Sequence, residues 1–563
     1  MKVVETDVLV IGGGIAGCFA ALRASEIAKD ITILEKSTIK RGGAVGPGMD
    51  HIQPGIGSPI SGAPTLEMEL ESAQSKKLRQ RLVDPNIYLS QSREGYDRLE
   101  DWESFGVKIK EDDGSYSLIW MPERPGFSQL YIRGADMKVR QGEAVHKQHN
   151  IHVLDRVMGV DLFVQDGKVT GAIGFNTRSG EVTAFLSKAT ILSTGPADRQ
   201  YINPDGLFLT YYSPASAGDG QAIAYRAGAE IINAEFGLMD YTTCRSGGGI
   251  FGVHAFGKMP ILRNRLGENV LKNLEDSAKR GTLMVKEITE GRGPLYFDAS
   301  EMPEDEFRLM DRSIDHEYPI TRKWYKERGL DLRKSLIPVQ IVMTATGAQI
   351  LADENCRTSM KGLYVAGQTG HEMGTLFGAS VSGHRAGEVA AGDALKAEKP
   401  ALDEEQVQKI EKVIKAPLAI RDGVDSIDLE EAVRGINTDY VGYYRSEGMM
   451  QKGLELLLKH RKVHLSNLCA KNPHELMRCL EVRNIFDISE MHIRASLVRK
   501  ETRLIGTGMT HHNRVDYPDT DPVWEKWIVV EIEDGEMKLS TKEIPGLKES
   551  LINEVENEIR RRG

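Results

Sequence analysis

TDVLVIGGGIAGCFAALRASEIAKDITILEK, residues 6–36, decides the fold of this chain. Its residues 7–11, DVLVI, form a nearly continuous apolar run, which is typical of a parallel strand that is covered on both faces. Gly12, Gly14 and Gly17 follow at the spacing G-x-G-x-x-G, and a helical stretch then leads to a second apolar strand that ends at Glu35. The segment therefore predicts a strand–turn–helix–strand unit.

The three glycines of this turn suit a bound dinucleotide. The first permits the tight turn, the second lets a pyrophosphate approach the backbone, and the third lets helix and strand pack closely. The helix N-terminus offers free N–H groups and a partial positive charge to the phosphates. Glu35 stands about where an acidic side chain takes ribose hydroxyls. The segment predicts a dinucleotide site, with a ligand-free glycine turn as the alternative, and it leaves NAD, NADP and FAD open.

Size and composition exclude several classes of protein. A chain of 563 residues is too long for one core and should divide into two to four domains. The net charge of -10 argues against a nucleic-acid binder. Five cysteines without any C-x-x-C exclude an iron–sulfur cluster of the usual spacing and suit a reducing compartment, so we expect a cytoplasmic protein. The sequence contains no uninterrupted run of 18 apolar residues, so it predicts no membrane span.

Periodicity and turn signals predict the elements along the chain. The predicted elements are helix over about 66–102, a hairpin around Asp166-Gly167, a strand at 189–193, a helix over about 218–231, mainly helix over 396–503, strands at 527–532 and 537–539, and an otherwise irregular tail.

A second glycine segment, GLYVAGQ at residues 362–368, suggests the other half of a split site. A strand that ends in Ala-Gly before a helix would place N–H groups beside a ligand; the alternative is a buried strand with a glycine turn. Paired with the first turn, it looks like the two-part site of FAD enzymes, with the adenosine and pyrophosphate at the first part and the isoalloxazine near the second. The run ILSTG at 191–195 resembles the strand end that such flavoproteins place near the pyrophosphate.

The chain resembles the flavoprotein subunits of succinate dehydrogenase, fumarate reductase, L-aspartate oxidase and adenylylsulfate reductase. RKETR at 499–503, RVDYP at 514–518 and Trp524 are similar to the C-terminal signature of this superfamily. HELMR at 474–478 and GTLFGASVSGHRAG at 374–387 resemble the adenylylsulfate reductase alpha subunit more than the fumarate reductases.

This resemblance implies an α/β fold, with a Rossmann-like FAD-binding domain, an inserted α+β capping domain and a C-terminal helical domain. The implied boundaries are 1–235 and 338–395 for the FAD-binding domain, 236–337 for the cap, 396–520 for the helical domain and 521–563 for the tail. The implied cofactor residues are Gly12, Gly14, Ile15, Ala16, Gly17, Glu35, Lys36, Arg41, Gly42, Gly43, Ala44, Val157, Thr194, Gly195, Gly367, Gln368, Ser380, Val381 and Ser382. A helix terminus near residues 380–383 is expected to stabilise the reduced flavin, and no metal site is expected.

The departures from the family pattern bear on chemistry. The succinate and fumarate enzymes of the family attach FAD covalently through the histidine of R-S-H-T, and here residues 41–44 read Arg-Gly-Gly-Ala, so a non-covalent flavin is expected. The substrate histidine and arginine of the fumarate reductases are missing from residues 343–348 and 378–381. The tryptophan that stacks on the substrate in adenylylsulfate reductases is replaced by His254.

The candidate catalytic residues are His254, Arg280 and Arg292. His254 would donate a proton or stack on the substrate, and the arginines would bind an anion when the cap closes; the alternative for each is a solvated surface residue. His384 and Arg385 would either stabilise anionic flavin or lie on the outer face of their helix.

The predicted function is an FAD-dependent oxidoreductase like the adenylylsulfate reductase alpha subunit. It would exchange electrons with a ferredoxin-like iron–sulfur protein in a hetero-oligomer and would reduce or oxidise a small anionic substrate at flavin N5. Two alternatives stay open: a reductase or dehydrogenase of an activated C=C bond, and an electron-transfer subunit without a substrate of its own.

Overall fold

A mainly parallel sheet, buried between helices, forms the centre of the computed structural model, which describes residues 1–49, 51–56, 58, 60, 63–120, 128–202, 213–242, 261–275, 277–317, 319–370, 375–505 and 510–562. Its strand order is β6-β2-β1-β9-β8-β7, with β17 also paired to β9. The strands are β1 (Lys2–Ile11), β2 (Ile31–Glu35), β6 (Ile151–Asp155), β7 (Val157–Gln165), β8 (Lys168–Asn176), β9 (Val182–Leu192) and β17 (Leu363–Val365). Val8, Leu9 and Val10 are fully buried, which confirms the two-sided strand that the apolar run predicted.

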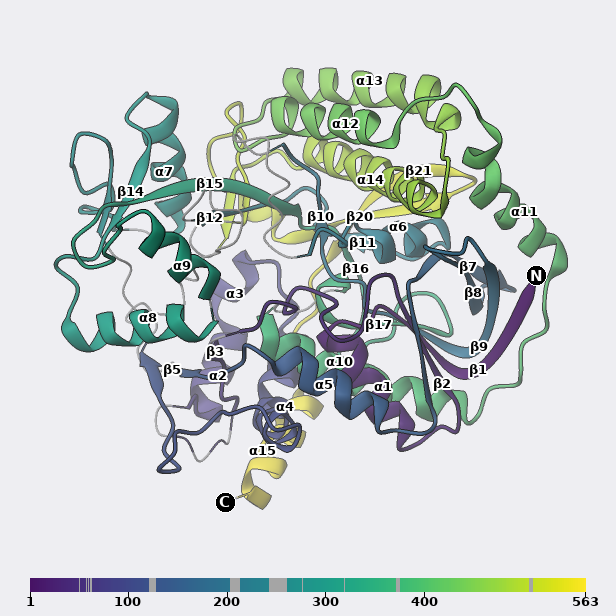
Figure 1. The fold of residues 1–563 in the computed structure, drawn as a ribbon, viewed down its shortest axis with the longest axis horizontal. Helices are drawn as coiled ribbons and strands as arrows, with labels where there is room; N and C mark the ends of the chain where they lie inside the picture. Colours follow the sequence, from purple (N-terminus) through teal and green to yellow (C-terminus); the bar gives the residue numbers. More distant parts are fainter. Residues whose placement is uncertain are drawn as a thin grey trace.

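Two helices that cover this sheet pack closely against each other. They are α1 (Ile15–Ser25) and α10 (Thr375–Ala394), which lie side by side in Figure 1 although they are far apart in the sequence. A Cβ added to Gly383 of α10 would stand 2.3 Å from the carbonyl oxygen of Ala16. Glycine at this position therefore lets α10 approach α1 closely. The helix α5 (Met137–His146) also packs on α1.

A second sheet carries the region that was predicted to form the cap. Its order is β13-β14-β15-β12-β19-β18, with β10 (Ala197–Asp198) also paired to β15. The strands are β12 (Gly237–Thr242), β13 (Ile261–Arg263), β14 (Leu295–Asp298), β15 (Ile337–Thr346), β18 (Arg503–Ile505) and β19 (Thr510–His512). The helices α7 (Arg280–Thr289), α8 (Glu304–Glu317) and α9 (Pro319–Glu327) accompany it on the left of Figure 1.

The C-terminal part is mainly helical, as predicted. The helices α11 (Glu404–Lys415), α12 (Ser426–Tyr440), α13 (Glu447–His464) and α14 (Pro473–Val498) lie along the top and right of Figure 1. Their apolar faces share one core with the β7–β8 hairpin, in which Phe163 and Phe175 pack with Val433 and Phe486. The predicted hairpin turn is confirmed, because Asp166 and Gly167 both have positive φ.

Three predictions of helices from the sequence were wrong. The helix predicted over 218–231 is α6 (Asp219–Arg226), because Gly228 at φ +99° ends it and the chain continues into β11 (Ile231–Ile232). The helix predicted over 66–102 is three helices, α2 (Leu66–Gln74), α3 (Lys76–Gln80) and α4 (Pro85–Ser104), since Pro85 begins a new helix. The tail contains an additional helix, α15 (Glu549–Arg562), which buries Leu551 and Val555 against Leu89 of α4.

The remaining elements are short. The predicted strands in the tail are confirmed as β20 (Lys526–Glu533) and β21 (Glu536–Glu543), in a sheet with β11 and β16 (Gln349–Ile350). A three-stranded sheet contains β3 (His51–Ile52), β4 (Leu118–Trp120) and β5 (Ser128–Tyr131). Within the described ranges, no helix combines the length and the apolar character that crossing a bilayer requires.

Candidate functional site

The first glycine turn is held tightly between β1, α1 and β9. Gly12 has φ +108°, and a Cβ there would stand 2.4 Å from the carbonyl oxygen of Ser193. A Cβ on Gly17 would stand 1.8 Å from the carbonyl oxygen of Gly12. The Ser193 hydroxyl donates to that same oxygen at 2.8 Å. No larger residue fits at Gly12 or Gly17 without moving backbone, so the fingerprint spacing has a steric cause in this fold.

Glu35 lies at the carboxyl end of β2 and is tied to the turn. Its Oε2 accepts a 2.8 Å hydrogen bond from the backbone N–H of Gly13. Its Oε1 accepts from the backbone N–H and the hydroxyl of Ser37, each at 2.7 Å. The side chain is buried, so these donors fix an anionic acceptor beside the glycine turn.

The N-terminus of α1 fits a phosphate group. Gly14 is its N-cap residue, no side chain caps it, and its first turn carries no acidic residue. The first N–H groups of an α-helix have no partner within the helix and attract anions. Gly43 approaches this point, since a Cβ on Gly43 would stand 3.0 Å from Cα of Gly14. The neighbouring Arg41 is exposed and donates to the carbonyl oxygen of Gly46 at 2.8 Å.

The second glycine segment meets the first at the start of α1. Gly367 has φ +67°, and a Cβ on it would stand 3.0 Å from Cβ of Ala16. Its N–H donates to the hydroxyl of Ser382 at 3.0 Å. Gln368 follows in the 3₁₀ helix η3 (Gly367–Thr369) and is half-buried. Two segments that are distant in the sequence are thus brought together, as a split dinucleotide site requires.

Thr194 and Gly195, which follow the end of β9, lie close to the second glycine segment. The N–H of Gly195 donates to the Thr369 hydroxyl at 2.8 Å, and the Thr194 hydroxyl accepts from the N–H of Gly220 at 3.0 Å. Val157, at the start of β7, is half-buried against the core of the central sheet. The contacts of Thr194 and Gly195 therefore connect the second glycine segment to the start of α6.

The expectation of a helix terminus near residues 380–383 was wrong. Ser380, Val381 and Ser382 lie in the interior of α10, so their backbone N–H groups belong to the helix. The hydroxyl of Ser380 donates to the carbonyl oxygen of Leu376 at 2.7 Å and accepts from the indole N–H of Trp102 at 3.2 Å. These residues position the second glycine segment and α4 rather than present a helix end.

Lys36 belongs to a buried ion network that the sequence did not reveal. Its Nζ lies 2.6 Å from Oδ2 of Asp219 and 2.7 Å from Oε1 of Glu481. Arg199 pairs with Glu481 at 2.7 Å and also pairs with Glu430 of α12. Burial lowers the pKa of the Lys36 ammonium, but the two carboxylates outweigh it and hold the pKa above its usual value. The Lys36 side chain therefore joins the glycine turn to the helical domain.

The two candidate arginines of the cap differ in their surroundings. Arg292 donates from Nε to Oε2 of Glu287 at 2.7 Å and from Nη2 to Glu290. The hydrogen bond with Glu287, and to a smaller extent the one with Glu290, raises the pKa of Arg292. Arg280 begins α7 and is buried. Two acids already neutralise Arg292, which weighs against it as an anion-binding residue. His254 lies outside the described residues.

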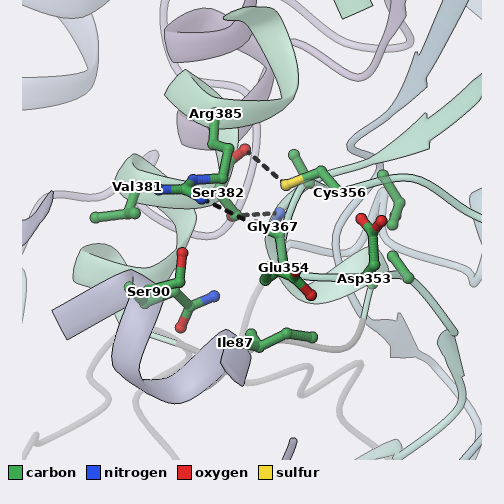
Figure 2. A pocket seen from close by; sticks show the side chains of 14 residues that line it. Ile87, Ser90, Asp353, Glu354, Cys356, Gly367, Val381, Ser382 and Arg385 are labelled. Carbon is green, nitrogen blue, oxygen red and sulfur yellow. Dashed lines mark hydrogen bonds between the residues drawn. The ribbon is translucent and has the colours of Figure 1, made fainter. Parts of the chain in front are cut away.

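A small cavity lies behind the second glycine segment. Figure 2 shows that Arg385, Ser382, Cys356, Glu354 and Gly367 line it. Its volume is about 20 Å³, which is enough for one water molecule. Arg385 reaches into it and pairs with Glu94, so it does not lie on the outer face of α10 as one alternative expected. Burial, followed by Arg98 and Arg23, lowers the pKa of the neighbouring His384 to about 3, so its imidazole is neutral at pH 7.

Comparisons with known proteins agree with this geometry. Residues 7–381 match the FAD binding domain family, and residues 430–556 match the C-terminal domain of fumarate reductase flavoproteins. The chain is 28% identical to one of the subunits of the fumarate reductase (CoM/CoB) from Methanothermobacter marburgensis, over 93% of this chain and 97% of that protein. It is 26% identical to L-aspartate oxidase from Pseudomonas aeruginosa, over 93% and 98% respectively.

Solved structures share the fold at lower sequence identity. Adenylylsulfate reductase from Archaeoglobus fulgidus matches with a TM-score of 0.84 and 23% identity, over 97% of this chain and 96% of that chain. The quinol fumarate reductase of E. coli matches with a TM-score of 0.81 and 20% identity, over 97% of each chain.

Proposed function

The chain belongs to the succinate dehydrogenase/fumarate reductase family of FAD-dependent oxidoreductases, and from that premise we propose that it holds one FAD non-covalently and uses it to reduce a small anionic substrate. The observation that carries the proposal is the meeting of the two glycine segments, where Gly367 lies against Ala16. Bound FAD would supply hydride chemistry, and the protein supplies orientation and charge.

The residues that would hold FAD follow from the contacts of the site. Glu35 would accept hydrogen bonds from the adenosine ribose, because Gly13 and Ser37 fix its carboxylate. The uncapped turn that begins at Gly14 would bind the pyrophosphate. Thr194, Gly195, Gly367 and Gln368 would line the path toward the flavin ring. The absence of histidine from residues 41–44 supports a non-covalent flavin.

The cap would supply the charge that binds the substrate. Arg280, which is buried where α7 begins, is the candidate for this role by its position in the cap, and Arg292 already pairs with Glu287 and Glu290. A buried guanidinium binds a carboxylate, phosphate or sulfate strongly because water does not compete for its donors. His254 is retained as a candidate proton donor or stacking residue on the strength of the sequence alone.

We also propose a separate iron–sulfur protein as electron partner and a hetero-oligomer as the working form. The sequence has no cysteine spacing for a cluster of its own, and the M. marburgensis relative is named as one subunit of an enzyme. The described cysteines are all free thiols, which supports a reducing compartment and a cytoplasmic location.

Two substrate classes have specific support. Adenylylsulfate is favoured by residues 374–387 and 474–478, which resemble the adenylylsulfate reductase alpha subunit. An activated C=C bond is favoured by the relative named for fumarate, which spans nearly the whole chain. A subunit that only transfers electrons is the remaining alternative.

Reoxidation of the reduced flavoprotein tests the proposal. The purified protein is photoreduced without oxygen and then mixed with adenylylsulfate or with fumarate, while the flavin absorbance is followed; sulfite plus AMP, which donates electrons, is added to the oxidised protein instead. Recovery of the oxidised spectrum with adenylylsulfate or fumarate supports a reductase. Reoxidation by none of these acceptors would leave the electron-transfer alternative in place of both enzymes.

A further inference from the structure

Two histidines continue the buried stripe of α13 at its C-terminal end. The buried residues of this helix are Met450, Gly453 and Leu457. The next positions of the stripe, three and seven residues after Leu457, are His460 and His464. Both histidines are half-buried, and α13 is the uppermost helix in Figure 1. Two imidazoles thus stand at the edge of the packed face, where the pattern would place apolar side chains.

The two rings are spaced as chelation of one metal ion requires. Residues four apart on a helix lie on the same face, one above the other. The ring centroids of His460 and His464 are 5.2 Å apart, and the ring planes are inclined by 41°. A Zn–N bond is about 2.1 Å long and a ring centroid lies about 1.2 Å behind its nitrogen, so two rings that share a tetrahedral ion have centroids about 5 Å apart. The observed separation therefore fits one shared ion without movement of the helix.

Neither imidazole is committed to another group in the described part of the chain. No hydrogen bond joins either ring to a described residue, and Nδ1 of His460 is buried without a partner. The other ring nitrogens reach solvent, so an ion can approach them from outside the protein. Within the described ranges no further histidine, cysteine, aspartate or glutamate completes a set of three with this pair, so water would fill the other coordination positions.

The basic residues around the pair do not exclude a cation. The guanidinium of Arg461 is directed elsewhere, since it pairs with Asp487 at 2.9 Å and with Glu490 at 3.3 Å. Lys459 and Lys462 are exposed, so water and salt screen their charges. The last carbonyl groups of a helix carry partial negative charge, and α13 ends at His464. The end of the helix therefore offers a cation some compensating charge.

The protonation of the pair also suits a metal ligand. Burial, followed by the charges of His464 and Lys459, lowers the pKa of His460. Its imidazole is therefore neutral at pH 7, and a neutral imidazole is the form that binds metals.

We propose that His460 and His464 bind one divalent ion of a late first-row transition metal, such as Zn²⁺, Ni²⁺ or Cu²⁺, at the C-terminal end of α13. Imidazole is a preferred ligand of these ions, whereas Mg²⁺ and Ca²⁺ prefer oxygen. The bound ion would join two successive turns of α13 and stabilise the folded helix. The site differs from the sequence-based expectation of no metal. It does not rest on the proposed function, since neither histidine is assigned to FAD or substrate.

Calorimetric titration with Zn²⁺ tests the site. The purified flavoprotein is treated with EDTA, dialysed and titrated with zinc chloride, and Mg²⁺ serves as the control ion. Loss of a group that only orients a metal ligand lowers affinity by about 10- to 100-fold, so removal of a ligand in His464→Asn should lower it by about 100-fold or more. His474→Asn, which removes a single exposed histidine from the start of α14, should bind Zn²⁺ like wild type.

A swap of two nearby residues separates the arrangement of the pair from the number of histidines. Lys462→His combined with His464→Lys keeps the composition and charge of the chain, but places the second imidazole two residues from His460, where the side chains do not face each other. This variant should bind Zn²⁺ as weakly as His464→Asn.

Thermal unfolding gives a second readout. A ligand that binds only the folded state raises its stability, so excess Zn²⁺ should raise the Tm of wild type and leave the Tm of the swapped variant unchanged. Wild type that binds no Zn²⁺, or equal Zn²⁺ affinity in wild type and the swapped variant, would overturn the proposal.

Discussion

The backbone N–H of Gly13 donates to Oε2 of Glu35 over 2.8 Å, which binds the end of β2 directly to the glycine turn. The backbone N–H and the hydroxyl of Ser37 donate to the other oxygen of the same carboxylate. The acidic residue at the strand end is therefore held in place before any cofactor arrives. Such preorganisation favours binding because little side-chain freedom is lost in the complex.

Replacing Glu35 with glutamine should weaken FAD binding, since the amide carries no charge and brings an N–H group to face Gly13 or Ser37. A hydrogen bond to a charged group contributes about 1.5–3 kcal/mol, which corresponds to a roughly 10- to 150-fold increase in Kd. The measurement is titration of apoprotein with FAD by flavin fluorescence. Glu26→Gln, at the exposed end of α1, is the control, and an equal Kd for both variants would contradict the role of Glu35.

Two glycines of α10 should respond oppositely to alanine. A Cβ on Gly383 would stand 2.3 Å from the carbonyl oxygen of Ala16, and a Cβ on Gly392 meets no atom within 4 Å. We expect Gly383→Ala to lower the free energy of unfolding by about 1–3 kcal/mol through overpacking. Gly392→Ala should be neutral or stabilising by up to about 1 kcal/mol, since alanine favours helix. Urea unfolding of both variants checks this, and equal stabilities would refute the close contact of α1 with α10.

Lys36→Met should destabilise the protein because it leaves Asp219 and Glu481 without their shared cation. Breaking a buried ion pair costs about 3–5 kcal/mol. The exposed pair of Lys452 with Glu455 is the control, and Lys452→Met should cost less than about 1 kcal/mol. Denaturant unfolding at pH 7 measures both, and similar losses in the two variants would show that the network contributes nothing special.

The same network predicts how stability depends on pH. Burial raises the pKa of Glu481, but the positive charges of Lys36, Arg199 and Arg478 lower it by more. The net result is a pKa of about 2, compared with the usual 4.5. The stabilisation from the ionised carboxylate is therefore complete above about pH 4.5 and is lost as pH falls toward 2. Unfolding free energies across this window should fall steeply in wild type and less steeply in Lys36→Met. Parallel curves would contradict the assignment.

Arg280 and Arg292 should differ in substrate kinetics. Removing a charge that acts on the substrate costs on the order of 100-fold in rate, so Arg280→Met should slow reoxidation of the photoreduced flavin by that amount. Arg292→Met should change the rate by less than about fivefold, because it removes only a partly exposed ion pair. A larger effect at Arg292 would reverse the assignment.

Local patterns predicted the parts of the fold that local forces determine. The glycine turn, the Asp166-Gly167 hairpin and the strands of the tail depend on the preferences of adjacent residues. The missed helix α15 also had a visible signal, since Leu551, Val555 and Ile559 recur every four residues. The two acids that occupy Arg292 were likewise near it in the sequence, at Glu287 and Glu290.

Features that depend on tertiary contacts were not predictable in this way. Lys36 pairs with carboxylates 183 and 445 residues further along the chain, so the sequence near Lys36 did not indicate that its ammonium group forms ion pairs. Asp198 looks like an ordinary polar residue after a strand until the register shows it buried opposite Ala345. The position of Ser380 inside α10 followed from where that helix begins, which the glycine-rich sequence before it did not indicate.

Release of the flavin tests the split, non-covalent FAD site most directly. The purified protein is precipitated with acid, and the supernatant and pellet are assayed separately for flavin by chromatography and absorbance. The site described here predicts one FAD per chain in the supernatant and a colourless pellet, with Glu35→Gln losing FAD during purification. Flavin that stays on the pellet, a flavin other than FAD, or apoprotein that fails to bind added FAD would contradict it.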